Sequence, residues 1–391
     1  MCKYEKLGRQ IIHMVGLYAY AMDDVEIGNA VASELLATVN GNDLEDPFWD
    51  IDHNFSNEFS LFIQTAKVKK LKDSYYLVKG FQTVLSESDE LIIEEWFEDY
   101  KDVVFRWFDS HTERILGDNW EHEGISSANP EGLYPSDFGD AYPLKHSNGD
   151  DQTEYGVSWF QNIFNNRMMD NVSYLHSWAV YAGDEELEHH SREFFKMVLR
   201  YGTWSDGTFW ELIRNTSSDN TLGVFYGNVT LTSLVYMAHL DAQANHFPND
   251  RLYDFKTTEG IIHGSTNITV EPYAGASTTD GETEKSVKTL LLGQSNYLRT
   301  SAYGGWSDLR YFNGSNMSTV GIRQNSVLGA IANLYYKDQD LEDYYLYNTA
   351  VGYPEKVAIY GGWGKVEDYG AWANFIIGGA WMKQENNFFN D

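Results

Sequence analysis

Cysteine, proline and basic residues are all scarce in this chain. Its 391 residues include one cysteine, Cys2, so the chain can form neither an internal disulfide nor a cysteine-based metal site. Only seven prolines interrupt it, and no apolar run reaches the length needed to span a membrane. Lys and Arg number 28 against 58 Asp and Glu, a formal net charge of −30. Nucleic acids and anionic membranes are bound through basic surfaces, so this charge argues against both as partners.

Aromatic residues, in contrast, are abundant, at 15% of the chain with 12 Trp and 27 Tyr. This is typical either of an aromatic core or of a cleft in which flat rings stack on sugars, and both can hold at once. The length and the 42% hydrophobic content are sufficient for one large domain or two ordinary ones. Because no linker or shift in composition marks a boundary, we predict a single domain over residues 1–391.

Apolar residues recur at three- and four-residue steps along most of the chain, as in amphipathic helices. The pattern predicts helices over 10–38, 89–116, 153–181, 185–203, 221–243 and 318–337. Long loops rich in Gly, Asn and Asp separate them, and β-branched alternation within 263–282 is compatible with a short β-hairpin. We therefore predict an all-α fold, an (α/α) toroid or incomplete barrel of helical hairpins. A helical solenoid is the main alternative, but it would normally show a fixed repeat, which this sequence lacks.

The first residues loosely resemble a signal peptide, since three basic residues precede an apolar stretch at 11–17. The helical period continues beyond that stretch, so we interpret it as the first helix of the toroid. Asn-x-Ser/Thr sequons suit a secreted protein, although an Asn- and Ser-rich chain also produces them by chance. They occur at Asn54, Asn171, Asn215, Asn228, Asn267, Asn313 and Asn316. We expect a monomer that is secreted or periplasmic.

Three segments carry candidate catalytic chemistry: 159–167, 206–214 and 225–228. In the second, a glycine-containing turn leads into Glu-Leu-Ile-Arg, which ends at Arg214. In the third, Tyr226-Gly-Asn opens a predicted helix. These features resemble the alginate lyases of polysaccharide lyase families 5 and 38, in which Glu-Leu-x-Arg is followed by Tyr-x-Asn before a Leu-rich helix. The resemblance covers roughly residues 159–245.

The same families carry Asn-Asn-His upstream, where this chain has Asn165, Asn166 and Arg167. Two departures stand out: Arg167 replaces the histidine, and the loop between Arg214 and Tyr226 is a few residues longer. The resemblance implies a lyase that cleaves an anionic polysaccharide, a 4-linked polyuronate, by β-elimination. It also implies four catalytic residues, which are Tyr226, Asn166, Arg167 and Arg214. We expect neither a metal nor a cofactor.

The chemistry explains why these residue types are needed. Removal of H5 develops negative charge next to a carboxylate, so Asn and Arg must neutralise that carboxylate in the transition state. A tyrosine can take H5 and protonate O4 if neighbouring Arg lowers its pKa from about 10. H5 and O4 lie on one face in mannuronate and glucuronate, whereas guluronate requires a second base such as His. With Arg167 in place of that histidine, we predict syn elimination on poly-mannuronate or glucuronan.

Further residues are candidates for substrate binding, and each candidate has an alternative structural interpretation. The substrate-binding candidates are Asn165, Trp120, His122, Trp159, Trp210 and Asn228. Structurally, Tyr226 can be a core residue, Arg214 a helix cap, and Asn165-Asn166 a helix break. His122 can be a second base or a surface residue, and we expect His176 to pack in the core.

Two other functions remain open on the sequence. A glycoside hydrolase on the same barrel would use two carboxylates, for which candidates are Asp206, Glu211, Glu121, Glu123 and Asp137. A non-catalytic glycan-binding protein would share only the scaffold, since a fold does not fix a function.

Overall fold

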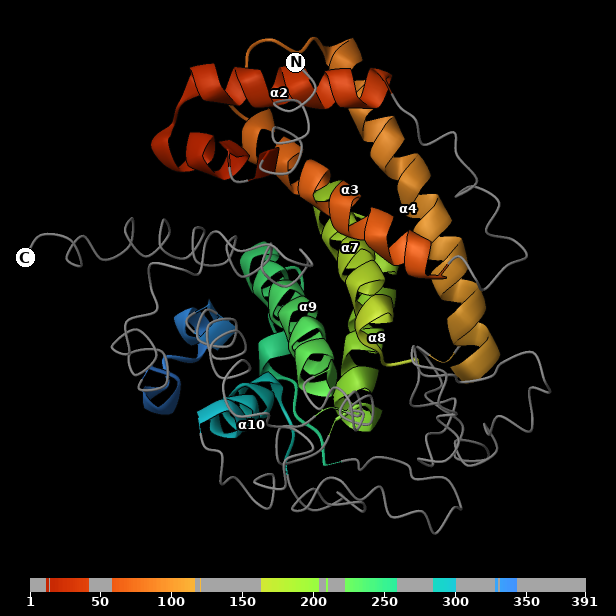
Figure 1. Cartoon of the computed structure of the whole chain (residues 1–391), viewed down its shortest axis with the longest axis vertical. Coiled ribbons are helices and arrows are strands. Elements are labelled where there is room, and N and C mark those ends of the chain that lie inside the picture. The colour runs from red at the N-terminus through yellow and green to blue at the C-terminus, as the bar shows by residue number, and fades with distance from the viewer. Residues whose placement is uncertain are drawn as a thin grey trace, which may run out of the picture. The chain divides into compact units, whose positions relative to one another are not determined.

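The computed structural model describes residues 12–13, 15–41, 58–116, 120, 163–203, 209, 222–258, 284–299, 328–329 and 331–342 (Figure 1). These residues are mostly helical and include no strand, which confirms the all-α prediction. Two isolated β-bridges join Thr203 to Phe209 and Thr257 to Lys285. No helix in these ranges is long and apolar enough to cross a membrane. The predicted hairpin at 263–282 lies outside them.

The chain divides into two compact units, with the boundary after Trp107. In the first unit, a helical segment at 15–22 is followed by α2 (Val25–Asn40), α3 (Glu58–Lys79) and α4 (Glu87–Leu116), which carries the boundary. The expectation of one helix over 10–38 is wrong, because Asp23 adopts a positive φ of 52° that ends the first segment. The carboxylate of Asp24 then caps α2 by accepting from the Ile27 N–H at 3.0 Å.

Helix α3 was not predicted, because its buried surface includes charged residues. Lys69 and Lys72 are both fully buried, and the Lys72 ammonium lies 2.9 Å from the Asp73 carboxylate. Burial lowers the pKa of Lys72 although Asp73 raises it. An amphipathic pattern that counts only apolar positions therefore fails on this helix. The prediction over 89–116, in contrast, corresponds to α4.

The second unit contains α7 (Asn166–Ala182), α8 (Glu185–Tyr201), α9 (Leu222–Ala244), the 3-10 helix η7 (Leu252–Asp254) and α10 (Val287–Arg299). The predicted ranges 185–203 and 221–243 match α8 and α9. Of 153–181 the described part is helical from Asn166, and of 318–337 residues 328–329 and 331–336 are helical. The helix α10 was not predicted. The single domain expected over residues 1–391 stays a prediction.

Helices α7, α8 and α9 pack against one another through α7, which lies side by side with both (Figure 1). A two-residue turn joins α7 to α8: Gly183 takes the left-handed conformation with φ 74°, and Asp184 caps α8. The two helices are therefore antiparallel. The end of α9 lies at the beginning of α8, because Asp241 pairs with Arg192 and His246 bonds to Glu188. It follows that α7 and α9 are parallel and begin at the same end of the bundle.

Candidate functional site

The residues predicted for the site divide into three groups. Arg214, Trp159, Trp210 and His122 lie outside the described residues. Tyr226 and Asn228 lie in the second turn of α9, where the structure gives their backbone. Asn165, Asn166, Arg167 and Trp120 are described with their side chains.

The three motif residues on α7 form its first turn. The Asn165 side-chain oxygen accepts from the backbone N–H groups of Arg167 at 2.8 Å and Met168 at 2.9 Å, so Asn165 is the N-cap. Asn165 therefore begins α7 as its cap. Asn166 is only 1% exposed, whereas Arg167 is half-buried. The turn thus holds one amide in the interior next to a cation nearer the surface.

The register of the helices brings Tyr226 towards this turn. His176 of α7 contacts Ser191 of α8, whose neighbour Arg192 pairs with Asp241 of α9. Counting back from these contacts at a rise of about 1.5 Å per residue puts Tyr226 about 9 Å beyond the first residue of α7 along the common axis. The backbone of Tyr226 therefore lies on the neighbouring helix at the same end of the bundle as the first turn of α7.

A row of buried polar residues continues along α7 from Asn166. Asp170, Ser173 and Ser177 follow at helical spacing on the same face and are all buried. The two serine hydroxyls donate to the carbonyls of Asp170 and Tyr174, at 2.8 and 2.9 Å, and so are satisfied within the helix. Sequence reasoning missed Asp170, a carboxylate 1% exposed one turn beyond Asn166. An acidic residue within a helix rich in apolar residues was the available signal.

Asn171, on another side of α7, was also missed as a structural feature. It is fully buried, and neither atom of its side-chain amide has a hydrogen-bond partner in the part of the chain that the structure describes. Leaving such a group unpaired costs about 1–3 kcal/mol. The sequon at Asn171 is therefore inaccessible to glycosylation in the folded protein.

Trp120 lies in the core of the second unit. It is 1% exposed, and its ring makes edge contacts with Phe108, His190 and Phe194 at centroid distances of 6.4, 5.0 and 6.0 Å. We expected Trp120 to stack on a sugar, but its ring packs against these three side chains and is buried. The aromatic-core interpretation therefore applies to this residue.

His176 packs as expected. It is fully buried, and its Nδ1 lies 2.9 Å from the Ser191 hydroxyl, which itself donates to the Glu188 carbonyl at 2.8 Å. This chain of bonds links the middle of α7 to α8.

Charged residues join α8 to the end of α9 and the segment that follows it. Arg192, 1% exposed, pairs with buried Asp241 and with Asp250 at 3.1 Å, and Lys196 bonds to Asp250 at 2.7 Å. Asp241 also accepts from the Leu252 N–H at 2.9 Å. Burial raises the pKa of Asp250, but hydrogen bonds and charge from Lys196 and Arg192 outweigh it and hold that pKa below its usual value. Because every cation here already has a carboxylate partner, we interpret this ion network as structural.

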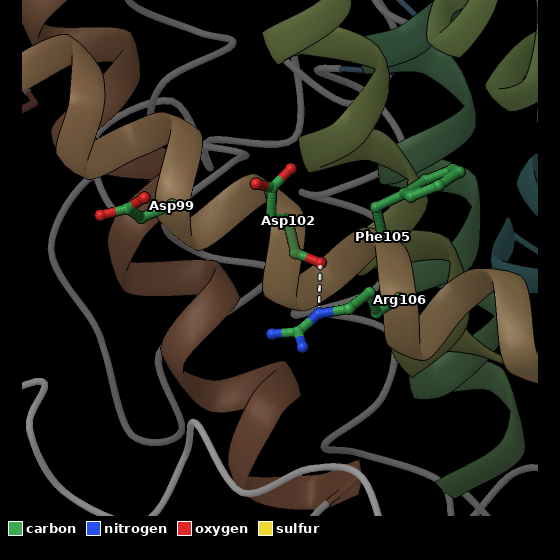
Figure 2. A pocket seen from close by; sticks show the side chains of 4 residues that line it. All are labelled: Asp99, Asp102, Phe105 and Arg106. Carbon is green, nitrogen blue, oxygen red and sulfur yellow. Dashed lines mark hydrogen bonds between the residues drawn. The ribbon is translucent and has the colours of Figure 1, made fainter.

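The hollow on α4 holds none of the predicted site residues. Asp99, Asp102, Phe105 and Arg106 line it along one side of the helix (Figure 2). The Arg106 Nε donates to the Asp102 carbonyl of its own helix at 3.4 Å. The Asp102 carboxylate also pairs with Lys101 at 2.5 Å, so this hollow carries no excess of positive charge that would favour a polyanionic substrate.

Metal ligands and known relatives give no further assignment. Across the described ranges, no group of three or more His, Cys, Asp or Glu residues is placed to hold a metal ion. Comparisons with protein-family models, with curated proteins and with solved structures find no match to this chain.

Proposed function

We propose that the protein is a polysaccharide lyase, built on an (α/α) toroid, that cleaves a 4-linked polyuronate by syn β-elimination. The substrate class is poly-mannuronate or alginate, or glucuronan. The observation that carries the proposal is the shared end of α7 and α9. Two motifs far apart in the sequence, Asn165–Arg167 and Tyr226, belong to parallel packed helices and lie within about two turns of each other along the axis.

In the proposed reaction, the Tyr226 phenolate takes H5 of the uronate. The electrons of the C5–H bond form the C4–C5 double bond, and the C4–O4 bond breaks. The phenol then returns the proton to O4 of the leaving sugar, so one residue serves as base and acid. Both steps require H5 and O4 on the same face of the ring.

The charge of the substrate carboxylate must be neutralised for this step. The contacts at the beginning of α7 limit which groups are available for this role. Asn165 already binds two of the first N–H groups of α7, so the end of this helix offers fewer free donors to an anion. We therefore assign neutralisation to the side chains of Asn166, Arg167 and Arg214. The same arginines lower the pKa of Tyr226 in the proposed site.

A substrate panel with one matched pair of variants tests the proposal. Incubation with mannuronan, glucuronan and poly-guluronate should raise the ultraviolet absorbance of the unsaturated product with the first or second, and much less with the third. Tyr226→Phe should lower the rate at least about 100-fold, because it removes both base and acid. Tyr181→Phe, on the exposed end of α7, is the control and should not change it.

Other outcomes separate the remaining functions. New reducing ends without absorbance would contradict the lyase and indicate a hydrolase with paired carboxylates. Retained glycan binding without any cleavage would indicate a non-catalytic glycan-binding protein. Equal rates on poly-guluronate and poly-mannuronate would refute the syn mechanism. A secreted or periplasmic location and a monomeric state belong to the same proposal, since polyuronates are extracellular polymers.

A further inference from the structure

Exposed apolar side chains concentrate in one part of the first unit. Of the large hydrophobic side chains that are exposed in the described part of the chain, all but Tyr181 lie within residues 18–25 or 84–92. Met22, 61% exposed, and Val25 flank the turn before α2. Val84 lies in the turn before α4, and Leu91, 58% exposed, lies in the second turn of that helix. We call these four residues the two-turn patch.

The two turns are held together by direct contacts. The Asn29 side chain donates to the Thr83 hydroxyl at 3.1 Å and accepts from the Thr83 N–H at 2.7 Å. One residue earlier on α2, the absence of a side chain at Gly28 leaves room for the Phe81 ring, which a Cβ atom would strike. The N-terminal part of α2 and the segment that leads into α4 are therefore in direct contact.

The second turn is also rigid within itself. Gln82 accepts from the N–H groups of Val84 at 3.0 Å and Leu85 at 2.8 Å, and donates to Glu90 at 2.7 Å. Ser86 and Asp89 bond to each other reciprocally at the beginning of α4. A surface fixed in this way loses little conformational entropy when a partner binds.

Acidic residues predominate in the two segments that carry the patch, and the nearest described cation along the chain, Lys79, pairs with Glu94. The segments 15–29 and 80–95 contain no Lys or Arg, and their acidic residues are Asp23, Asp24, Glu26, Glu87, Asp89, Glu90, Glu94 and Glu95. A second copy of the same surface would be repelled, and so would an anionic membrane. A complementary partner combines an apolar stripe with cations on both sides.

We propose that the two-turn patch docks a basic amphipathic helix of a protein partner. The apolar stripe of such a helix covers Met22, Val25, Val84 and Leu91, and its flanking Lys and Arg residues meet the surrounding carboxylates. The inference does not rest on the lyase proposal, because no residue proposed for catalysis lies in this unit's patch.

Binding of a designed peptide tests the docking site. The probe is a fluorescein-labelled helical peptide of Leu and Lys with one apolar face, and its control has the same composition in an order without a face. Fluorescence anisotropy with the full chain should show tighter binding of the first peptide, weakening as salt rises. The double variant Met22→Ser/Leu91→Ser should weaken that binding at least tenfold, while Tyr181→Ser should change it less than twofold.

Glu26→Gln/Glu87→Gln should weaken binding and reduce its salt dependence, with the apolar patch intact. Equal binding of the two peptides would overturn the proposal, because net charge alone would then explain the interaction. An equal loss in the Tyr181→Ser control would also overturn it, because binding would then not depend on the two-turn patch. Unchanged thermal unfolding of each variant, followed by circular dichroism, separates loss of binding from loss of fold. If the chain self-associates in sedimentation velocity and Met22→Ser/Leu91→Ser abolishes this, the patch binds a second copy of the chain and the proposed partner is wrong. If the chain floats with phosphatidylserine vesicles, the patch binds a membrane and the proposed partner is likewise wrong.

Discussion

Replacing Arg192 by Met should be among the most destabilising single changes in the second unit. Arg192 is 1% exposed, and its guanidinium pairs with Asp241, which is equally buried, and with Asp250. It also lies 4.2 Å from the centre of the Phe247 ring. Without the arginine, the Asp241 carboxylate keeps one donor in the described residues around it, the Leu252 N–H at 2.9 Å. Breaking a buried pair in this way costs about 3–5 kcal/mol.

Protonation of the Asp241 carboxylate limits the loss of folding free energy that Arg192→Met can cause. An unpaired buried carboxylate can take a proton, and at pH 7 this costs about 4 kcal/mol relative to an ordinary Asp with a pKa near 3.9. At pH 5 protonation of the same carboxylate costs only about 1.5 kcal/mol. The loss caused by Arg192→Met should therefore shrink by about 2–3 kcal/mol between pH 7 and pH 5, because a raised carboxyl pKa favours the folded variant at lower pH.

Urea unfolding followed by circular dichroism at both pH values measures these differences, with an unchanged slope as the check on the transition. Asp241→Asn in the Arg192→Met background should recover part of the loss, since the amide still accepts from Leu252 without a charge. Lys256→Met is the matched control, because the Lys256–Glu284 pair at 3.0 Å is more than half exposed. It should change stability by about 0.5 kcal/mol or less. A loss below about 1 kcal/mol for Arg192→Met, or one independent of pH, would refute the reasoning.

Three further changes test other parts of the second unit. Burial lowers the pKa of His239 to about 4, so only the unfolded chain gains a proton between pH 6.5 and 4. Stability should fall by up to about 3 kcal/mol over that range, and His239→Gln should flatten the fall in urea titrations; an unchanged slope would contradict this. Lys285→Met should cost about 2 kcal/mol in thermal unfolding, because the buried ammonium donates to the carbonyls of Arg200 at 2.6 Å and Thr203 at 3.1 Å; no loss would contradict the role of that cap. Asn171→Leu should raise the free energy of unfolding by about 1 kcal/mol or more, since it replaces an unpaired amide by an apolar group of similar shape; a lower midpoint would show that the amide has a bound partner.

The sequence predicted those helices whose ends and faces both have clear signals. α8 has an Asp184 cap, acidic residues in its first turn and Gly202 after its last, and its predicted range differs from the observed one by two residues. The apolar period ran through Asp23 and Asp24, because side-chain spacing does not reveal a single residue of positive φ. In α3, buried Lys69 and Lys72 stand where apolar residues are expected.

The candidate site was less predictable than the fold. The resemblance identified Asn165, Asn166 and Tyr226, but only the packing of α8 against the end of α9 shows that their helices run parallel. Asp170 drew no attention, because an acidic residue within a helix usually faces solvent, whereas every side of α7 is covered. For Trp120 the sequence predicted a substrate-binding ring where the structure has a core ring, because a tryptophan in a core and one in a cleft cannot be distinguished by sequence alone.

Thirteen of the 17 residues of α7 are buried, so this helix has almost no solvent-facing side along which to absorb a change in length. One added residue would rotate everything after it by about 100° and turn the Asn166–Asp170 row away from the residues beyond it. Natural length variation in this unit is therefore expected in connections such as the exposed Gly183 turn and not within α7. Between homologous chains, a gap-free block over Asn166–Ala179 should accordingly anchor the alignment, even where the chemistry of the individual positions has drifted.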